Sequence, residues 1–328
     1  MESAYLDWNI LSQTKSPKNE VQLELRKKVN SIKNNFFIPY SPAHLEDLRK
    51  GYFKEGPDKT FTQKDLEYID STTNGNYIFY NSETGIIIKG VNSAIDSFES
   101  YKEPQTKVID NLDLEKVFSE NEMEDFMPLG KLLTDMFKAM PVPVNIDGKQ
   151  NTKEFKDLQQ MLPSLGSGGS MYDLMQDLAG FVDEINVNPE KYKNVRNGFR
   201  TSLDIPTNIS NAKNSNEVDT ILSKTKLTNS FDSLTQRGLQ QNKKNTFYDE
   251  FILAYANLDM IGFHPEELNK KNTYKNFSND AQHAFFATYC DCFVTSDATG
   301  YAKAKFLFEK YQLKTKALTL KEFLELSI

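Results

Sequence analysis

The sequence predicts an α/β fold in which a parallel sheet is flanked by helices and carries a mostly helical insertion. Short apolar runs alternate with amphipathic helical patterns in residues 1–55 and again in residues 245–328. This alternation is typical of parallel strands covered by helices. Residues 56–244 lack it and show mainly helical spacing. We therefore expect a core formed by residues 1–55 and 245–328, interrupted by an insertion over residues 56–244.

The first predicted elements lie in residues 1–55. Residues 4–6 are apolar and precede Asp7, which indicates a short buried strand that ends in polar residues. A helix is expected over residues 16–33, where Pro17 suits the first turn. Residues 36–40 then predict a second strand, and Ser41 with Pro42 starts a helix that runs to about residue 50.

The remaining elements follow the same reasoning. We expect a helix over residues 280–289, a strand over 292–295, a helix over 301–311, a strand over 316–319 and a helix over 320–326. Within the insertion, residues 75–90 carry a β-hairpin signal whose turn lies at 81–85. Residues 126–185 have helical spacing, interrupted by prolines and by a glycine-rich stretch.

Composition narrows the classes of function. The 328 residues include 38% hydrophobic and 26% charged residues, with a net charge of −7, which disfavours a general polyanion binder. Two cysteines and three histidines are too few for a disulfide scaffold or a Cys/His zinc site. We find no signal-peptide pattern and no apolar run of transmembrane length. The expected location is therefore the cytoplasm, without a membrane partner.

Four aspartates occupy positions where strands end or helices begin, namely Asp7, Asp47, Asp280 and Asp297. In a parallel α/β sheet, ligands bind at the carboxyl edge, where such residues meet. Carboxylates gathered there repel one another unless their pKa values shift or divalent cations neutralise them. Mg²⁺ or Mn²⁺ is the simpler explanation, although aspartate in these positions also serves as a turn former or helix cap.

These residues resemble the motifs of PIN-domain nucleases, a metal-dependent family that includes toxin ribonucleases. The run YLDWNIL is similar to the family's first strand and acid at Asp7, and SPAHLEDLRKG is similar to its second motif, with the acid at Asp47. The run DAQHAFFATYCDCFVTSDATG matches the third and fourth motifs through Asp280 and Asp297, and KALTLKEFLEL matches the closing strand and helix. The resemblance implies a PIN-like sheet with a large insertion.

The resemblance also implies supporting roles for Asn9 and Thr295 beside the acids. His44 stands where the family often has threonine, and Asp47 is shorter than the usual glutamate. Whether Asp47 or its neighbour Glu46 reaches the metal therefore stays open.

Two histidines lie three residues from a candidate acid, His44 before Asp47 and His283 after Asp280. Helical geometry places each on the face of its acid, where it would orient the carboxylate, contact phosphate or ligate a softer metal, with the orienting role favoured over ligation. A histidine satisfied within the core is an equally good interpretation.

A local basic segment offers a second kind of functional residue. Residues 186–245 contain ten Lys and Arg against five Asp and Glu, and aromatic residues alternate with the cations near residue 195. Such a segment would grip phosphates and stack bases, although charge runs are more often plain solvated surface. The candidate substrate-binding residues are Lys191, Lys193, Arg196 and Arg200.

The leading hypothesis is a metal-dependent endonuclease that hydrolyses phosphodiester bonds, in RNA rather than DNA, by a two-metal mechanism. A structure-dependent DNase of the same fold is one alternative, and a non-catalytic nucleic-acid-binding scaffold is another. The resemblance further implies that copies of the chain can associate.

Overall fold

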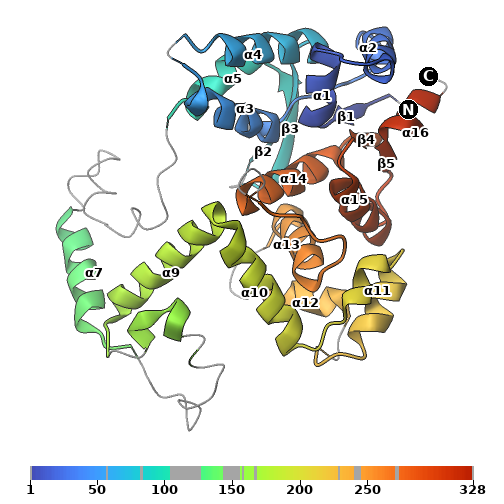
Figure 1. Ribbon diagram of the computed structural model, residues 1–328. Helices are drawn as coiled ribbons and strands as arrows, with labels where there is room; N and C mark the ends of the chain where they lie inside the picture. The colour runs from blue at the N-terminus through green and yellow to red at the C-terminus, as the bar shows by residue number, and fades with distance from the viewer. Residues whose placement is uncertain are drawn as a thin grey trace. The chain divides into compact units, whose positions relative to one another are not determined.

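The computed structural model describes residues 2–56, 58–81, 84–103, 127–142, 156, 159–165, 168–227, 230–239, 245–269 and 273–326 (Figure 1). The chain divides into two compact units. The larger unit comprises Met1–Glu103, Lys193–Leu268 and Lys275–Ile328, and the smaller comprises Pro104–Tyr192 and Asn269–Tyr274. These limits differ from the predicted ones, because residues 56–103 and 193–244 belong with the sheet rather than with a separate insertion.

A three-stranded parallel sheet lies in the larger unit, so the fold class is α/β. Its strands are β1 (Ala4–Leu6), β4 (Cys292–Thr295) and β5 (Lys316–Thr319), in the order β1-β4-β5. Leu6 pairs with Val294, and Thr295 pairs with Thr319. Every residue of β1 and β4 is buried, which is typical of parallel strands covered on both faces and explains their short, uniformly apolar sequences.

Helices cover both faces of this sheet (Figure 1). On one face the core contains residues of α1 (Trp8–Lys15), α2 (Glu20–Ile32), α3 (Pro42–Lys54), α4 (Thr60–Thr73) and α5 (Ala94–Phe98), packed on Ala4, Leu6 and Val294. On the other face Tyr5 and Phe293 contact His283 of α14 (Tyr274–Ala287) and Phe308 of α15 (Ala298–Lys310), respectively. The alternation of side chains along β1 thus sets which helix each residue meets.

The first helices and strands differ in part from the prediction. The expected helix over 16–33 is two helices, since α1 already begins at Trp8 and α2 begins at Glu20. The expected strand over 36–40 forms only single parallel bridges, Ser3 with Phe37 and Tyr40 with Tyr77. Pro39 stands between these bridges and has no N–H to donate, which prevents a continuous ladder.

The hairpin expected near residue 81 is confirmed as β2 (Asn76–Asn81) paired antiparallel with β3 (Ile86–Val91). Tyr40 binds it through two backbone hydrogen bonds, from Tyr40 N to Asn76 O at 2.9 Å and from Ile78 N to Tyr40 O at 2.8 Å. The hairpin therefore belongs to the larger unit.

Further helices complete the larger unit: α11 (Ser215–Leu222), α12 (Phe231–Gly238), α13 (Phe247–Ile261) and α16 (Leu320–Glu325). The helix expected at 280–289 is α14, which begins earlier, at Tyr274, so that Asp280 lies inside it rather than at its start. The helix expected at 301–311 is α15, which begins at Ala298 with Asp297 as its N-cap. Asp280 therefore lies within α14, and Asp297 lies at the N-terminus of α15.

The described part of the smaller unit is helical, as the sequence predicts. It contains α7 (Met127–Ala139) and α9 (Met171–Val187), joined near one end by a bridge between Pro141 and Ser170. Helix α10 (Pro189–Ser202) begins in this unit and continues into the larger one. Part of the predicted helical region, residues 126 and 143–155 included, lies outside the described residues. Among the described helices, none combines the length and apolar character needed to cross a bilayer.

Candidate metal centre

Asp7 lies where β1 ends and α1 begins, at the carboxyl edge of the sheet. Its Oδ2 accepts hydrogen bonds from Thr295 Oγ1 at 2.7 Å and from Asn9 Nδ2 at 2.6 Å. Because β1 and β4 are adjacent parallel strands, Thr295 at the end of β4 lies directly beside Asp7. Asn9 and Thr295 thus hold one oxygen of this buried carboxylate and leave the other, Oδ1, directed at His283.

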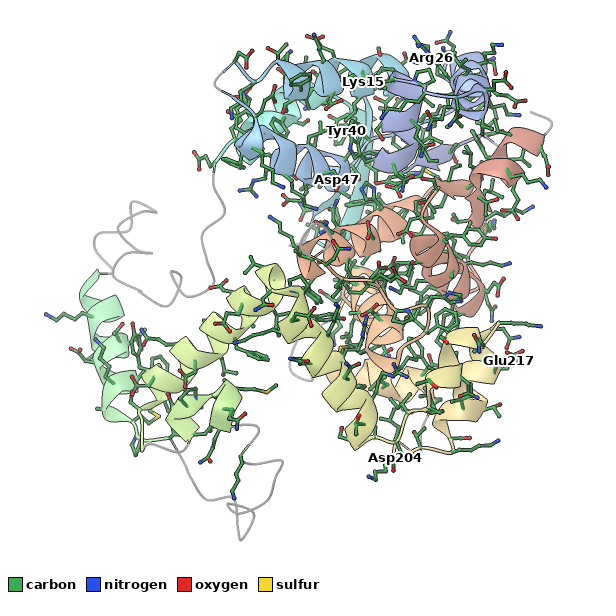
Figure 2. All side chains as sticks on the ribbon, in the orientation of Figure 1. Lys15, Arg26, Tyr40, Asp47, Asp204 and Glu217 are labelled. Atoms are coloured by element: carbon green, nitrogen blue, oxygen red, sulfur yellow. The ribbon has the colours of Figure 1, made fainter. Side chains whose placement is uncertain are left out.

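Asp47 reaches the same edge from α3 (Figure 2). Its Oδ1 accepts from Asn279 Nδ2 at 2.8 Å, and its Oδ2 lies 2.9 Å from His283 Nε2. His283 Nε2 is also 3.8 Å from Asp7 Oδ1, so the imidazole bridges the two carboxylates. The spacing rule paired His283 with Asp280, but the ring contacts the acids of two other elements instead.

The neighbouring glutamate is not part of this arrangement. Glu46 forms ion pairs with Arg49 at 3.4 Å and with Lys275 at 2.8 Å. Asp47, by contrast, belongs to a group with Asp7 and His283 whose potential ligand atoms all lie within 4.8 Å of one another. The geometry therefore favours Asp47 as the second acid.

A second group of three carboxylates lies at the same edge. Asp280 projects from α14, Asp297 caps α15 and accepts a hydrogen bond from Thr299 N at 2.9 Å, and Glu266 comes from the segment after α13. Their oxygens also lie within 4.8 Å of one another. Within the part of the chain that the structure describes, the Asp280 carboxylate has no hydrogen bond or ion pair.

Sequence reasoning missed Glu266, which lies in an irregular stretch without hydrophobic periodicity. A fully buried lysine holds it in place: Lys303 Nζ is 2.9 Å from Glu266 Oε1 and 3.1 Å from Asp259 Oδ1. Arg196 completes this network, with Nη1 3.0 Å from Asp259 Oδ2. A lysine inside the apolar face of α15 was the one available signal, because a buried cation requires an acid.

The electrostatic interactions connect the two groups. Burial, followed by the charges of Asp7 and Glu266, raises the pKa of Asp280 well above its usual value. Burial also raises the pKa of Asp7, although His283 opposes this shift. For Asp47, burial alone would raise the pKa, but the hydrogen bond and the charge of His283 outweigh it and lower the pKa.

The opposing pKa shifts distinguish the acids of the site that have a cationic partner from Asp280. Burial would lower the pKa of His283, but the negative charges of Asp7 and Asp47 outweigh this effect and raise it, which favours a protonated imidazole that would balance these two acids. Lys303 balances Glu266 in the same way. Asp280 has no comparable partner among the described residues, and its raised pKa favours the protonated form unless a cation lies beside it.

Comparisons with protein-family models, with curated proteins and with solved structures found no match. The assignment of this site therefore rests on its own chemistry. Three carboxylates at one point suit a hard divalent cation such as Mg²⁺ or Mn²⁺, which prefers oxygen ligands. The group that contains His283 would suit Mn²⁺ better than Mg²⁺, because imidazole is a softer ligand. The buried amide oxygen Oδ1 of Asn279 has no hydrogen-bond partner and offers one more oxygen ligand for a cation.

His44 is buried and hydrogen-bonded through both ring nitrogens, in agreement with the second of the two interpretations, a histidine satisfied within the core. Its Nδ1 accepts a hydrogen bond from Ser41 N at 3.1 Å, which completes the N-terminal cap of α3, and its Nε2 therefore donates to Leu6 O at 2.8 Å. Burial lowers the pKa of His44 to about 3, and the charge of His283 adds to this effect. His44 is thus a neutral residue that joins α3 to β1 and does not ligate or orient an acid directly.

Behind the site, Tyr5 connects the two histidines. Its hydroxyl lies 2.9 Å from His283 Nδ1 and 2.6 Å from Ser41 Oγ. When His283 is protonated, Nδ1 donates to the Tyr5 oxygen, and the Tyr5 hydroxyl donates to Ser41. This chain fixes the plane of the imidazole against both carboxylates.

Of the four candidate substrate-binding residues in the basic segment, one is buried and three are partly exposed. Arg196 is buried in its ion pair with Asp259, so the prediction that it contacts phosphate is wrong. Lys191 pairs with Glu184 in the smaller unit, and the guanidinium of Arg200 packs on Gly262, where an added Cβ would lie 2.9 Å from Arg200 Cζ. Lys191, Lys193 and Arg200 are partly exposed, and their role in substrate binding stays a prediction.

Proposed function

We propose that the protein is a metal-dependent nuclease that hydrolyses phosphodiester bonds, with RNA as the expected substrate and a PIN-like core as its scaffold. The observation that carries the proposal is the convergence of Asp7, Asp47, Asp280 and Asp297 from separate elements at the carboxyl edge of a parallel sheet. Such convergence costs electrostatic free energy in the folded protein. A bound divalent cation would offset this repulsion between the carboxylates.

Two groups of ligands at adjacent positions fit a two-metal arrangement. Bound divalent cations would activate water and neutralise the charge that develops on the phosphate during hydrolysis. Neighbouring side chains orient the carboxylates that would bind the cations. Asn9 and Thr295 orient the Asp7 carboxylate, and Lys303 orients that of Glu266. Protonated His283 would leave its place between Asp7 and Asp47, or lose its proton, when a cation binds there.

Hydrolysis of this kind needs no covalent intermediate, and the site has no nucleophilic cysteine. The thiols of Cys290 and Cys292 are buried, and burial raises the pKa of each to about 12. Both thiols therefore stay protonated and inert near neutral pH.

Cleavage of labelled single- and double-stranded RNA and DNA in Mg²⁺ or Mn²⁺ tests the proposal. Wild type should cleave, whereas Asp7→Asn and Asp280→Asn should lose activity. Asp204→Asn is the matched control, because Asp204 is an exposed aspartate far from Asp47 in Figure 2 and its backbone φ of 56° is readily adopted by asparagine.

The outcomes separate the candidate functions. Cleavage that survives both site substitutions, or that persists in EDTA, would contradict the proposal. Preference for RNA or DNA identifies the substrate class. Metal-independent binding of nucleic acid without any cleavage would favour the non-catalytic scaffold instead.

A further inference from the structure

The two ligand groups, Asp7–Asp47–His283 and Glu266–Asp280–Asp297, are together called the acidic cluster. A pocket lies beside it. It has a volume of about 360 Å³ and is bounded by residues of α1, α3 and α4 together with Glu55. Asp47 belongs both to this pocket and to the ligand group with Asp7 and His283. Small-molecule pockets span about 300–1,000 Å³, so this one is large enough for a single aromatic ring system but not for a folded domain.

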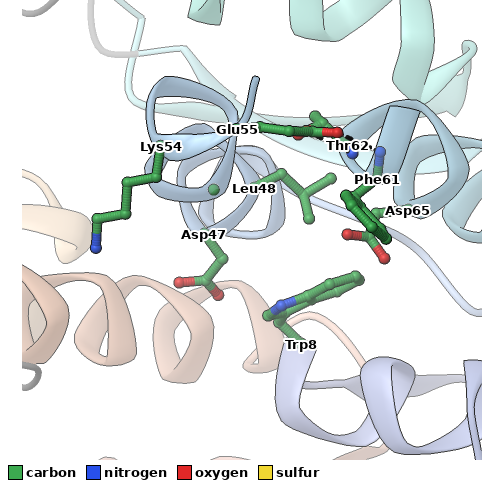
Figure 3. Close-up of a pocket in the computed structure, with 9 residues that line it drawn as sticks. Trp8, Asp47, Leu48, Lys54, Glu55, Phe61, Thr62 and Asp65 are labelled. Atoms are coloured by element: carbon green, nitrogen blue, oxygen red, sulfur yellow. Dashed lines mark hydrogen bonds between the residues drawn. The ribbon is translucent and has the colours of Figure 1, made fainter. Parts of the chain in front are cut away.

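Apolar and aromatic surfaces form much of the pocket. The indole of Trp8, the ring of Phe61 and the side chain of Leu48 border one space, with the Asp47 carboxylate at its side (Figure 3). Phe61 is 74% exposed, which makes it one of the most exposed large apolar side chains among the described residues. Trp8 is partly buried and packs against the core.

Hydrogen bonds hold the backbone of Phe61 at the start of α4. Glu55 accepts a hydrogen bond from Phe61 N, and its other oxygen accepts from Thr62 N at 3.0 Å and from Thr62 Oγ1 at 2.7 Å. The Glu55 carboxylate is thereby engaged within the protein. We call the space between these rings the Trp8–Phe61 pocket.

The charges around the pocket do not form a phosphate site. Asp65 is paired with Lys15 at 2.6 Å, and Glu55 is engaged as described. Asp47 is paired with His283 at 2.9 Å and with Lys50 at 3.7 Å. The remaining ionic group of the lining is the exposed Lys54. A phosphate would need several converging donors. An uncharged planar ring that stacks on aromatic side chains fits better, and Lys54 would attract the phosphate attached to it.

We propose that the Trp8–Phe61 pocket binds one unpaired nucleobase of the strand whose backbone lies at the acidic cluster. The inference rests on the proposed function for its class of ligand, and it specifies that the substrate is single-stranded at this position. A paired base is stacked within its duplex and cannot enter a pocket without being extruded.

The test uses Trp8 as its own reporter, because it is the only tryptophan in the sequence. Wild-type protein is titrated with a short single-stranded RNA in Ca²⁺, which takes oxygen ligands as Mg²⁺ does, and the RNA is checked for integrity afterwards. We expect quenching of Trp8 emission by this strand. A sugar-phosphate strand of equal length without bases, and the same RNA in a duplex, should leave the emission unchanged.

Phe61→Ala measures the contribution of stacking. Because Phe61 is largely exposed, the substitution should leave the fold intact and weaken binding roughly 5- to 150-fold, as followed by the anisotropy of a labelled strand. Phe79→Ala is the matched control: Phe79 is 43% exposed on β2 and does not border the pocket. Its affinity should equal that of wild type.

Equal affinity of Phe61→Ala and wild type, or equal quenching by the strand without bases, would overturn the pocket assignment. This failure differs from failure of the proposed nuclease. A protein that cleaves RNA while Trp8 emission stays constant refutes the pocket alone. A protein whose Trp8 responds to bases but which cleaves nothing refutes the nuclease alone.

Discussion

Replacing Asp280 by asparagine should stabilise the protein without metal and weaken its response to metal, because one of the two ligand groups loses a carboxylate. The Asp280 carboxylate lies among acids, with potential ligand atoms within 4.8 Å of those of Glu266 and Asp297. At that separation two unit charges repel by about 3.5 kcal/mol at an effective dielectric constant of about 20. Part of this repulsion is already relieved because burial and the neighbouring charges raise the pKa of Asp280, which favours its protonated form.

The expected gain in the free energy of unfolding is therefore about 1–3 kcal/mol in EDTA. Scanning calorimetry should show this as a rise in Tm of about 2 °C per kcal/mol. Mn²⁺ at about 100 times its Kd should stabilise wild type by about 2.7 kcal/mol and should stabilise Asp280→Asn by less. Asp204→Asn, an exposed control, should behave as wild type in both conditions.

A lower Tm for Asp280→Asn than for wild type in EDTA would refute the reasoning, because the carboxylate would then stabilise the fold by itself. Equal stabilisation of both proteins by Mn²⁺ would also refute it, since the ion would then bind elsewhere.

Three further predictions follow from the same contacts. Lys303→Met removes the cation shared by two buried carboxylates and should lower the free energy of unfolding by about 3–5 kcal/mol in urea titrations; a wild-type value would contradict the observed network. Thr295→Val removes the hydroxyl that donates to Asp7 at 2.7 Å and should cost about 1.5–3 kcal/mol of stability, which an unchanged Tm would exclude. Mn²⁺ affinity should fall as pH is lowered, because burial raises the pKa values of Asp7 and Asp280 and protons then compete with the metal; calorimetry that detects no proton release on binding would contradict this expectation.

The strands and the acids that follow them were predictable because their signal is local. Residues 292–295 are a short, mostly apolar run and residues 316–319 a short run with an apolar centre, each lying between helices, and both are strands with the expected limits. Asp7 and Asp297 follow strands directly, so the rule that parallel strands end at one edge places them together. The sequence alone therefore predicts the location of the site.

Residues that depend on tertiary packing were not predictable in this way. Glu266 lies in irregular structure and enters the site only because Lys303 and Arg196 fold against its segment. Arg196 itself looked like part of a solvated basic surface, yet Asp259 holds it in the interior. Counting charges along a sequence cannot distinguish these two environments.

The histidines show the same limit on a smaller scale. Helical spacing correctly places His283 near the acids, but its partners come from β1 and α3 rather than from its own helix. His44 is three residues from Asp47, yet it caps the helix that carries this acid. Spacing on one helix predicts which face a residue occupies, but not which element meets that face.

The pairing of β1 with β4 has a consequence for biosynthesis. The hydrogen bond between Thr295 and Asp7 joins positions 288 residues apart, and β1 has no β4 partner until synthesis has passed residue 295. Contacts over such separations close late and slowly during folding. A growing polypeptide therefore carries Asp7 without its β4 neighbour until Thr295 has been added, and the two ligand groups cannot both assemble before Asp297 has been added.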